Sequence, residues 1–177
     1  ADSLAGGIMQ KGYQCGMLWG ASLAVGAEAY RKYNNQNQAI CAAINATQSL
    51  MQSFLKRENT TNCRDITKCD FSSKLSFMKY FFSGRFLHCY NLADKWAPEA
   101  VKSAFEGLSN KEIILSKGCV SCATEVAKKM GSGDEEMTMV AGFAGGLGLS
   151  GSGCGALSAA IWLKSLEWCK KEKKKSS

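Results

Sequence analysis

The residues best suited to chemistry in this chain are its nine cysteines, and two of them occur in the same local pattern. Cys15 and Cys154 each follow a glycine-rich stretch and precede a glycine and a run of small apolar residues. The two stretches align without a gap at an offset of 139, and nine of the 24 positions from Ala5 to Glu28 are identical in the second copy. We interpret this as an internal repeat in which the local sequence around one cysteine is duplicated.

A cysteine at the start of a helix is a candidate for a reactive or metal-binding thiol. Backbone N–H groups and the helix dipole meet there, and both lower the pKa of a thiol and favour the thiolate. The glycines before it allow the backbone to approach a ligand closely. The structural alternative is that the glycines permit close packing and the cysteine is a small buried apolar residue. Because the pattern occurs twice, we expect Cys15 and Cys154 to be functional.

A second pattern is the C-x-x-C pair of Cys119 and Cys122, which is expected at the start of another helix. Such pairs act as dithiol/disulfide centres or supply two ligands to a metal. A thioredoxin-type site needs a βαβ unit, which the sequence does not predict, and Ala123 stands where covalent haem attachment requires a histidine. His88 is the only histidine, which excludes a bis-histidine haem and a Ser-His-Asp triad within one chain. We therefore expect no haem.

The remaining cysteines differ in what their surroundings predict. Cys63 lies in a polar, turn-like segment and Cys89 on the apolar face of a helix, whereas Cys41 and Cys169 are expected in the core and Cys69 is left open. An odd number of cysteines, in a chain long enough to bury its own core, favours thiols or metal ligands in a reducing compartment. We therefore expect reduced cysteines and a cytoplasmic location. The alternative is that the cysteines form disulfides.

Charge and motif content exclude several function classes. The net charge is +7, but the tail from Lys170 to Lys175 supplies +4 of it, so a nucleic-acid surface is not predicted. The chain has no P-loop and no dinucleotide fingerprint, so we expect no nucleotide cofactor. The longest uncharged run, Met137 to Leu163, is broken by a Gly-Ser loop, so no membrane span is expected.

The apolar spacing predicts an all-α protein. A helix is expected over 16–32, and a second over 36–57 with an apolar face formed by Ile40, Ile44, Thr47, Met51 and Phe54. Pro98 is expected to begin a helix of its own. We predict a helical bundle of two related halves, residues 1–108 and 109–169, joined by a connector over 109–118 and followed by a basic tail over 170–177.

These cysteines resemble those of the C_GCAxxG_C_C family of redox-active proteins, over most of the chain. Gly-Tyr-Gln-Cys15-Gly-Met-Leu-Trp-Gly is similar to the central motif of the family, and Asn-Cys63-Arg-Asp-Ile and Cys89 to its later pair. Ser-Cys122-Ala-Thr-Glu-Val is similar to its early cysteine, and Gly-Cys154-Gly-Ala-Leu to a second central motif. The early cysteine here follows the later pair, as in a duplicated protein trimmed at its front. The resemblance implies electron transfer or thiol redox chemistry with an iron–sulfur or similar metal centre.

We combine these observations into one hypothesis, a composite iron–sulfur-type centre ligated by Cys15, Cys63, Cys89 and Cys122. Cys119 and Cys154 are the next candidate ligands. The alternatives are a metal-free thiol–disulfide protein, and a structural or interaction module in which the cysteines are buried. A redox partner protein and a homo-oligomer are the expected kinds of partner, and whether the chain is an enzyme stays open.

Overall fold

A computed structural model describes residues 2–110 and 118–175 of the chain, and the predicted all-α fold is confirmed in these residues. No strand occurs in the described ranges; their extended pairing is limited to an isolated antiparallel bridge between Gln14 and Asn62. In chain order the elements are η1 (Asp2–Leu4), α1 (Gly16–Lys32), α2 (Gln36–Glu58), α3 (Cys63–Thr67), α4 (Lys74–Phe82), α5 (Phe86–Leu108), α7 (Cys122–Lys129), α8 (Asp134–Met139), η2 (Ala141–Phe143) and α9 (Gly155–Lys175). Most of the connector predicted over 109–118 lies outside the described residues.

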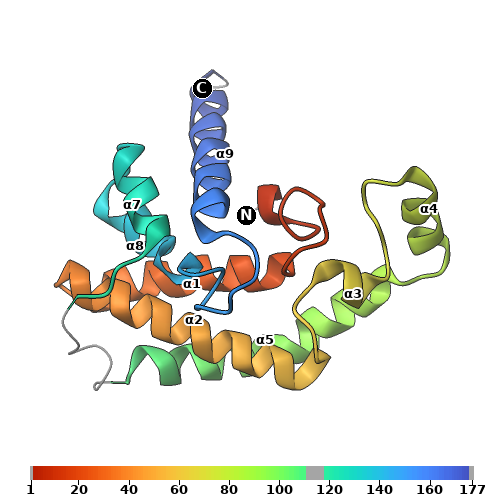
Figure 1. Cartoon of the computed structure of the whole chain (residues 1–177), viewed down its shortest axis with the longest axis horizontal. Coiled ribbons are helices and arrows are strands. Elements are labelled where there is room, and N and C mark those ends of the chain that lie inside the picture. The colour runs from red at the N-terminus through yellow and green to blue at the C-terminus, as the bar shows by residue number, and fades with distance from the viewer. Residues whose placement is uncertain (1, 111–117, 176–177) are drawn as a thin grey trace.

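Helices α1, α2 and α5 form the layer on which the other elements pack (Figure 1). Every residue of α2 from Ala39 to Thr47 is buried, because α1 and α5 both cover this helix. Small side chains allow the close approach: a Cβ added at Gly107 of α5 would overlap the Cα of Ala46. Edge-to-face ring pairs, Trp19 with Phe143 and Phe54 with Trp96, fill the space on either side of α2.

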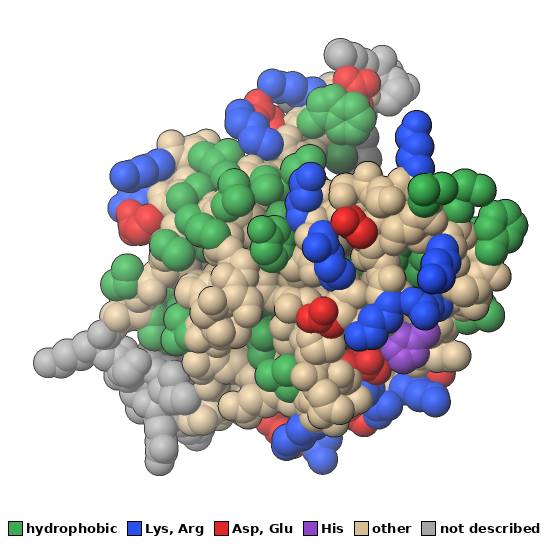
Figure 2. Space-filling model, turned by 45° about the vertical axis from the view of Figure 1, so that its right-hand side comes forward, with side chains coloured by type: hydrophobic (Ala, Val, Ile, Leu, Met, Phe, Trp, Pro, Cys, Tyr) green, Lys and Arg blue, Asp and Glu red, His purple; other side chains and the backbone are tan. Residues whose placement is uncertain are grey.

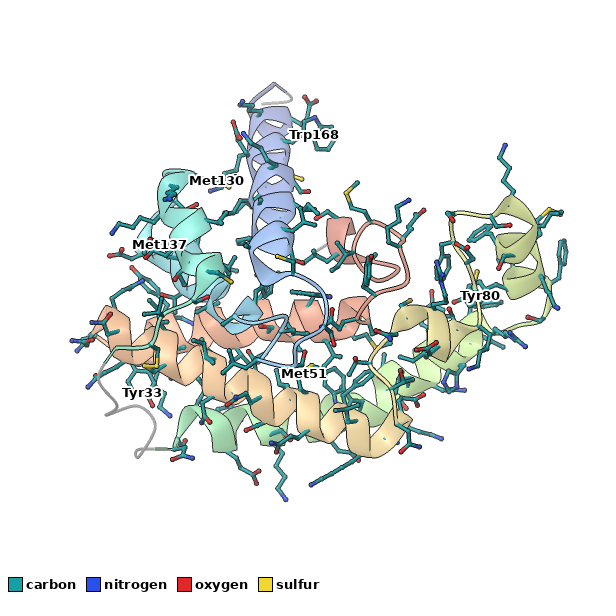
Figure 3. All side chains as sticks on the ribbon, viewed as in Figure 1. Tyr33, Met51, Tyr80, Met130, Met137 and Trp168 are labelled. Carbon is teal, nitrogen blue, oxygen red and sulfur yellow. A yellow bond between two sulfur atoms is a disulfide. The ribbon has the colours of Figure 1, made fainter. Side chains whose placement is uncertain are left out.

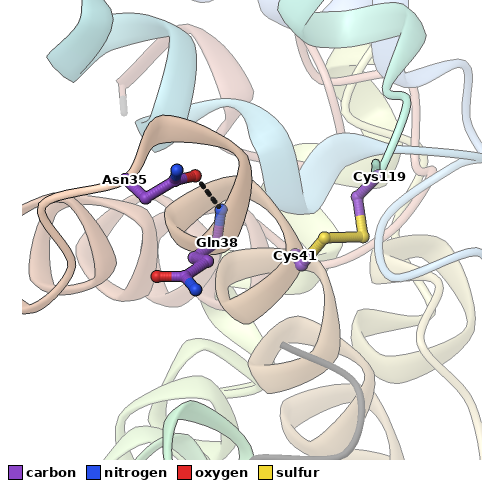
Figure 4. The surroundings of a disulfide bond; sticks show 4 residues. All are labelled: Asn35, Gln38, Cys41 and Cys119. Carbon is purple, nitrogen blue, oxygen red and sulfur yellow. Dashed lines mark hydrogen bonds between the residues drawn. A yellow bond between two sulfur atoms is a disulfide. The ribbon is translucent and has the colours of Figure 1, made fainter. Parts of the chain in front are cut away.

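Helix α9 stands steeply on this layer, between α7 and the N-terminal loop, and α4 projects at one end of the molecule (Figure 1). No helix among the described residues is long and apolar enough to cross a membrane. Helix α8 packs on α1 where Gly26 faces Thr138 and Met139. A disulfide links α2 to the segment just before α7: it joins Cys41 of α2 to Cys119 (Figure 4).

Pro98 does not begin a helix, so this prediction was wrong. It lies inside the continuous helix α5, which runs through it from Phe86 to Leu108. A proline inside a helix removes one backbone hydrogen bond. Burial compensates, because Leu92 and Trp96 before it and Ala100 after it all face the core.

The two glycine-rich loops, residues 4–13 and 143–151, follow the same backbone path. Ile8 N–H donates to the Leu4 carbonyl at 3.1 Å, and Leu147 N–H donates to the Phe143 carbonyl at 3.2 Å. The next bonds also correspond at the offset of 139, and residues 6–10 and 145–149 all have positive φ. Gln14 joins the loops: its side-chain amide donates to the Gly146 carbonyl at 2.7 Å and accepts from Gly153 N–H at 2.9 Å.

Candidate functional site

Two of the predicted site cysteines are brought side by side by the isolated bridge. The backbone N–H of Cys15 donates to the Thr61 carbonyl at 2.7 Å, and that of Cys63 donates to the Tyr13 carbonyl at 2.7 Å. The first loop therefore pairs with the segment that leads out of α2. Cys15 caps the start of α1 and Cys63 is the first residue of α3, and both are buried.

Two further thiols complete the group, Cys69 after α3 and Cys89 on α5. The Tyr80 hydroxyl of α4 lies 3.5 Å from the Cys89 sulfur, and the Ser76 hydroxyl donates to the Cys69 sulfur at 3.6 Å. Tyr80 reaches toward α5 from the projecting end of the molecule (Figure 3). We call Cys15, Cys63, Cys69 and Cys89 the thiol cluster. Within it Cys89 is half-buried and the other three are buried.

The thiols of the cluster act on one another electrostatically, which shows that they share one neighbourhood. The pKa of Cys63 is raised to about 12, first by burial and then by the proximity of Cys15 and Cys89. The pKa of Cys15 is raised to about 11, mainly by burial, and Cys89 and Glu58 contribute to this rise. Without a cation or metal nearby, both thiols are therefore protonated near neutral pH.

The expectation that the helix start would lower the pKa of Cys15 was wrong. Its sulfur does accept from the backbone N–H groups of Met17 and Leu18, and both lower the pKa as expected. Removal of the thiol from water outweighs them, because only 6% of Cys15 is exposed. Burial also raises the pKa of Tyr80, as does its bond to Cys89, so this phenol remains protonated and able to donate.

The other predicted site cysteines lie elsewhere. Cys122 is exposed as the first residue of α7, and Figure 1 shows α7 at the opposite end of the molecule from α3 and α4. Cys154 is exposed before α9. Cys119 is bonded to Cys41, which the sequence placed in the core as a thiol. The structure thus brings together Cys15, Cys63 and Cys89 and does not bring Cys122 to them.

Two members of the site, Cys69 and Tyr80, were not among the predicted site residues. Cys69 follows Cys63 closely, which is a weak signal in a cysteine-rich chain. Tyr80 belongs to the aromatic helix α4 and carries no motif of its own. Nothing local in the sequence indicates that α4 folds back over Cys69 and Cys89.

The residue types of the thiol cluster and their arrangement in space point to different conclusions about whether it could hold a metal ion. Thiolates are the ligands that iron–sulfur clusters and zinc prefer. Among the described residues, however, no three His, Cys, Asp or Glu side chains are grouped so that they could hold one metal ion. The donor type therefore fits a metal, and the grouping of the described side chains does not.

Comparison with known proteins identifies one relationship. Residues 1–132 match the model of a family described as "Putative redox-active protein (C_GCAxxG_C_C)". The matched range contains the whole thiol cluster and the Cys119–Cys122 pair, and it ends before Cys154. No curated protein and no solved structure matches the chain.

Proposed function

Because the chain belongs to the C_GCAxxG_C_C family of redox-active proteins, we propose that its thiol cluster carries two electrons by thiol–disulfide exchange. The observation that supports this best is the meeting of thiols from α1, α3 and α5 at one site with Cys89 on its accessible side. A half-buried thiol beside buried ones can be reached by a partner disulfide, while the buried thiols are protected from other oxidants.

The exchange has two steps. The Cys89 thiol loses its proton and its sulfur attacks a partner disulfide, which forms a mixed disulfide and releases one partner thiol after protonation. Cys15 or Cys63 then loses its proton and attacks the Cys89 sulfur, which releases the second partner thiol. Two cluster thiols are oxidised to one disulfide, one partner disulfide is reduced to two thiols, and the two protons pass to the partner sulfurs.

Tyr80 has a specific role in this scheme. Its protonated hydroxyl lies 3.5 Å from the Cys89 sulfur and can donate to the thiolate that forms before attack. A hydrogen bond to the charged form favours that form. The raised pKa of Cys15 and Cys63 also means that each of these buried thiols must give up a tightly held proton before it attacks.

Differential labelling tests the proposal. Anaerobic protein is treated with 2-hydroxyethyl disulfide, unfolded in urea so that the buried thiols are accessible, and blocked with N-ethylmaleimide, and its peptides are mapped by mass spectrometry before and after reduction. We expect a disulfide from Cys89 to Cys15 or Cys63 in the wild type and in the matched control Cys169→Ser, and none in Cys89→Ser. The proposal fails when every cluster thiol still reacts with maleimide after treatment with the disulfide.

An iron–sulfur centre at the thiol cluster is the second candidate. The family and the thiolate donor type support it, with Cys69 in the place that the sequence suggested for Cys122, whereas the grouping of the described side chains does not. When bound, such a centre would supply one-electron transfer. Iron and sulfide in stoichiometric amounts in anaerobically purified protein, lost in Cys63→Ser, would favour this candidate over the first. A metal-free preparation would rule it out.

A further inference from the structure

Helix α4 and the start of α5 expose an unusually apolar surface. Helix α4 has no buried residue. Leu75 is 81% exposed, Phe82 80% and Tyr90 70%. We call the exposed apolar residues of these two segments the aromatic surface: Leu75, Phe77, Met78, Phe81, Phe82, Leu87 and Tyr90. Contiguous exposed apolar area of this kind marks an interaction site in folded proteins.

The aromatic surface continues to the accessible thiol of the cluster. Phe81 stacks on Phe86 with ring centroids 5.5 Å apart, and Phe86 contacts Tyr90 edge to face at 6.4 Å. Cys89 lies on α5 between Phe86 and Tyr90, and Tyr80 of α4 contacts its sulfur. A molecule that covers this surface therefore lies beside the sulfur that the exchange uses.

The charge of the same segment has one sign. Lys74, Lys79 and Arg85 are exposed, and no acidic residue occurs between Asp70 and Asp94. Figure 2 shows hydrophobic side chains at the right of the view with lysine and arginine side chains next to them. An apolar centre with a basic rim is complementary to an apolar patch edged by carboxylates.

We propose that the aromatic surface is the docking site of the redox partner, a protein whose disulfide lies in an apolar patch edged by acidic residues. This inference rests on the proposed function, because it names the partner of the same thiol cluster. A protein partner fits better than a lipid surface, since exchange requires a partner sulfur to reach bonding distance of Cys89. Aromatic residues and arginine are also the types enriched where proteins bind one another.

Two peptide probes test the docking. Both are mixed disulfides with thionitrobenzoate and have the same apolar aromatic centre, flanked by glutamates in one and by lysines in the other. The protein carries Cys122→Ser, Cys154→Ser and Cys169→Ser, so that the exposed thiols do not compete. The neutral reagent 4,4′-dithiodipyridine serves as a probe that needs no docking. We expect the glutamate peptide to react about tenfold faster than the lysine peptide at low salt, and the ratio to fall as salt is added.

Variants of the aromatic surface give the decisive comparison. Lys79→Glu should reduce the advantage of the glutamate peptide to about twofold or less, because steering by charge is lost. Phe82→Ser should slow both peptides several-fold and leave their ratio in place, because both bury the same apolar centre on this surface. Leu157→Ser, a matched control on α9 where Leu157 is 56% exposed, should leave the ratio unchanged. All variants should react with 4,4′-dithiodipyridine at the wild-type rate.

The outcomes separate the two proposals. Equal rates for the two peptides, with normal oxidation by 4,4′-dithiodipyridine, overturn the docking site and leave the thiol exchange intact. Failure of 4,4′-dithiodipyridine to oxidise the cluster overturns the exchange, and the docking site with it. Binding to phosphatidylglycerol vesicles that Phe82→Ser abolishes would assign the surface to a membrane instead. A wild-type dimer that the same substitution dissociates would assign it to a second copy of the chain.

Discussion

The disulfide between Cys41 and Cys119 is expected to be the strongest single restraint on the second part of the chain. It closes a loop with a sequence separation of 78. For a loop of that length, the chain-entropy relation gives about 4 to 5 kcal/mol at 25 °C, at the upper end of what native disulfides contribute. Cys119→Ala should therefore lower the free energy of unfolding by about 2 to 5 kcal/mol, the range in which removal of a native disulfide falls.

Urea unfolding under anaerobic, non-reducing conditions measures this effect. Cys119→Ala is preferable to a change at Cys41, because Cys41 is only 1% exposed and its replacement would also disturb the packing of α2. Cys122→Ala is the matched control, since the exposed Cys122 belongs to the same C-x-x-C pair; it should shift stability by less than about 0.5 kcal/mol. Excess dithiothreitol should remove the difference between the wild type and Cys119→Ala. Alkylation of Cys119 in the native, unreduced protein would refute the reasoning, as would wild-type stability of Cys119→Ala.

Three further predictions follow from burial and close contact. Gly26→Ala should destabilise the protein by more than about 2 kcal/mol in urea unfolding, because its Cβ would lie 2.5 Å from the Met139 Cα. Gly20→Ala on the same helix is the control: its Cβ would meet open space, and the substitution should stabilise the protein by up to about 1 kcal/mol. Gln14→Leu should cost about 1 to 3 kcal/mol in the same assay, because it removes the side-chain partner of the Gly153 N–H and one of the two donors to the Gly146 carbonyl, which keeps the Ser150 hydroxyl. The pKa of Cys15 is raised from 9.0 to about 11 on folding, so its contribution to stability is complete below pH 9 and lost as pH rises toward 11. Between pH 9 and pH 11, the free energy of unfolding of the wild type should fall by about 3 kcal/mol more than that of Cys15→Ala. Parallel pH profiles of the two free energies would contradict the burial argument.

The helical elements could be predicted from the sequence where apolar spacing and helix ends agreed. The helix expected over 16–32 has those bounds in the structure, and the one expected over 36–57 ends a residue later. Pro98 misled the prediction, because its local cost is outweighed by the burial of Leu92, Trp96 and Ala100 on the same helix. Local helix propensity and tertiary packing can favour different helix boundaries. The propensity can be read from the sequence, whereas the packing depends on the folded structure.

The candidate site was partly predictable for a different reason. Cys15, Cys63 and Cys89 were identified by residue type and motif, and the structure groups them. What joins Cys15 to Cys63 is a backbone bridge between Gln14 and Asn62, and backbone pairing over that distance leaves no pattern in side-chain types. The pairing of Cys41 with Cys119 was missed likewise, because Cys41 was expected in the core and Cys119 was assigned to a C-x-x-C pair with Cys122.

The two glycine-rich loops show how the same local structure can give two thiols different chemistry. Each loop turns through a run of positive φ angles fixed by the same hydrogen bonds, and each delivers its cysteine to the start of a helix. At the first loop, residues 61–63 pair with the backbone around Cys15 and bury this thiol. At the second loop, the Gln14 side chain binds Gly153, and Cys154 stays exposed. Burial raises the pKa of Cys15 against the effect of its own helix. The motif therefore fixes where the thiol is placed, and the segment that covers it decides its protonation and its access to a partner.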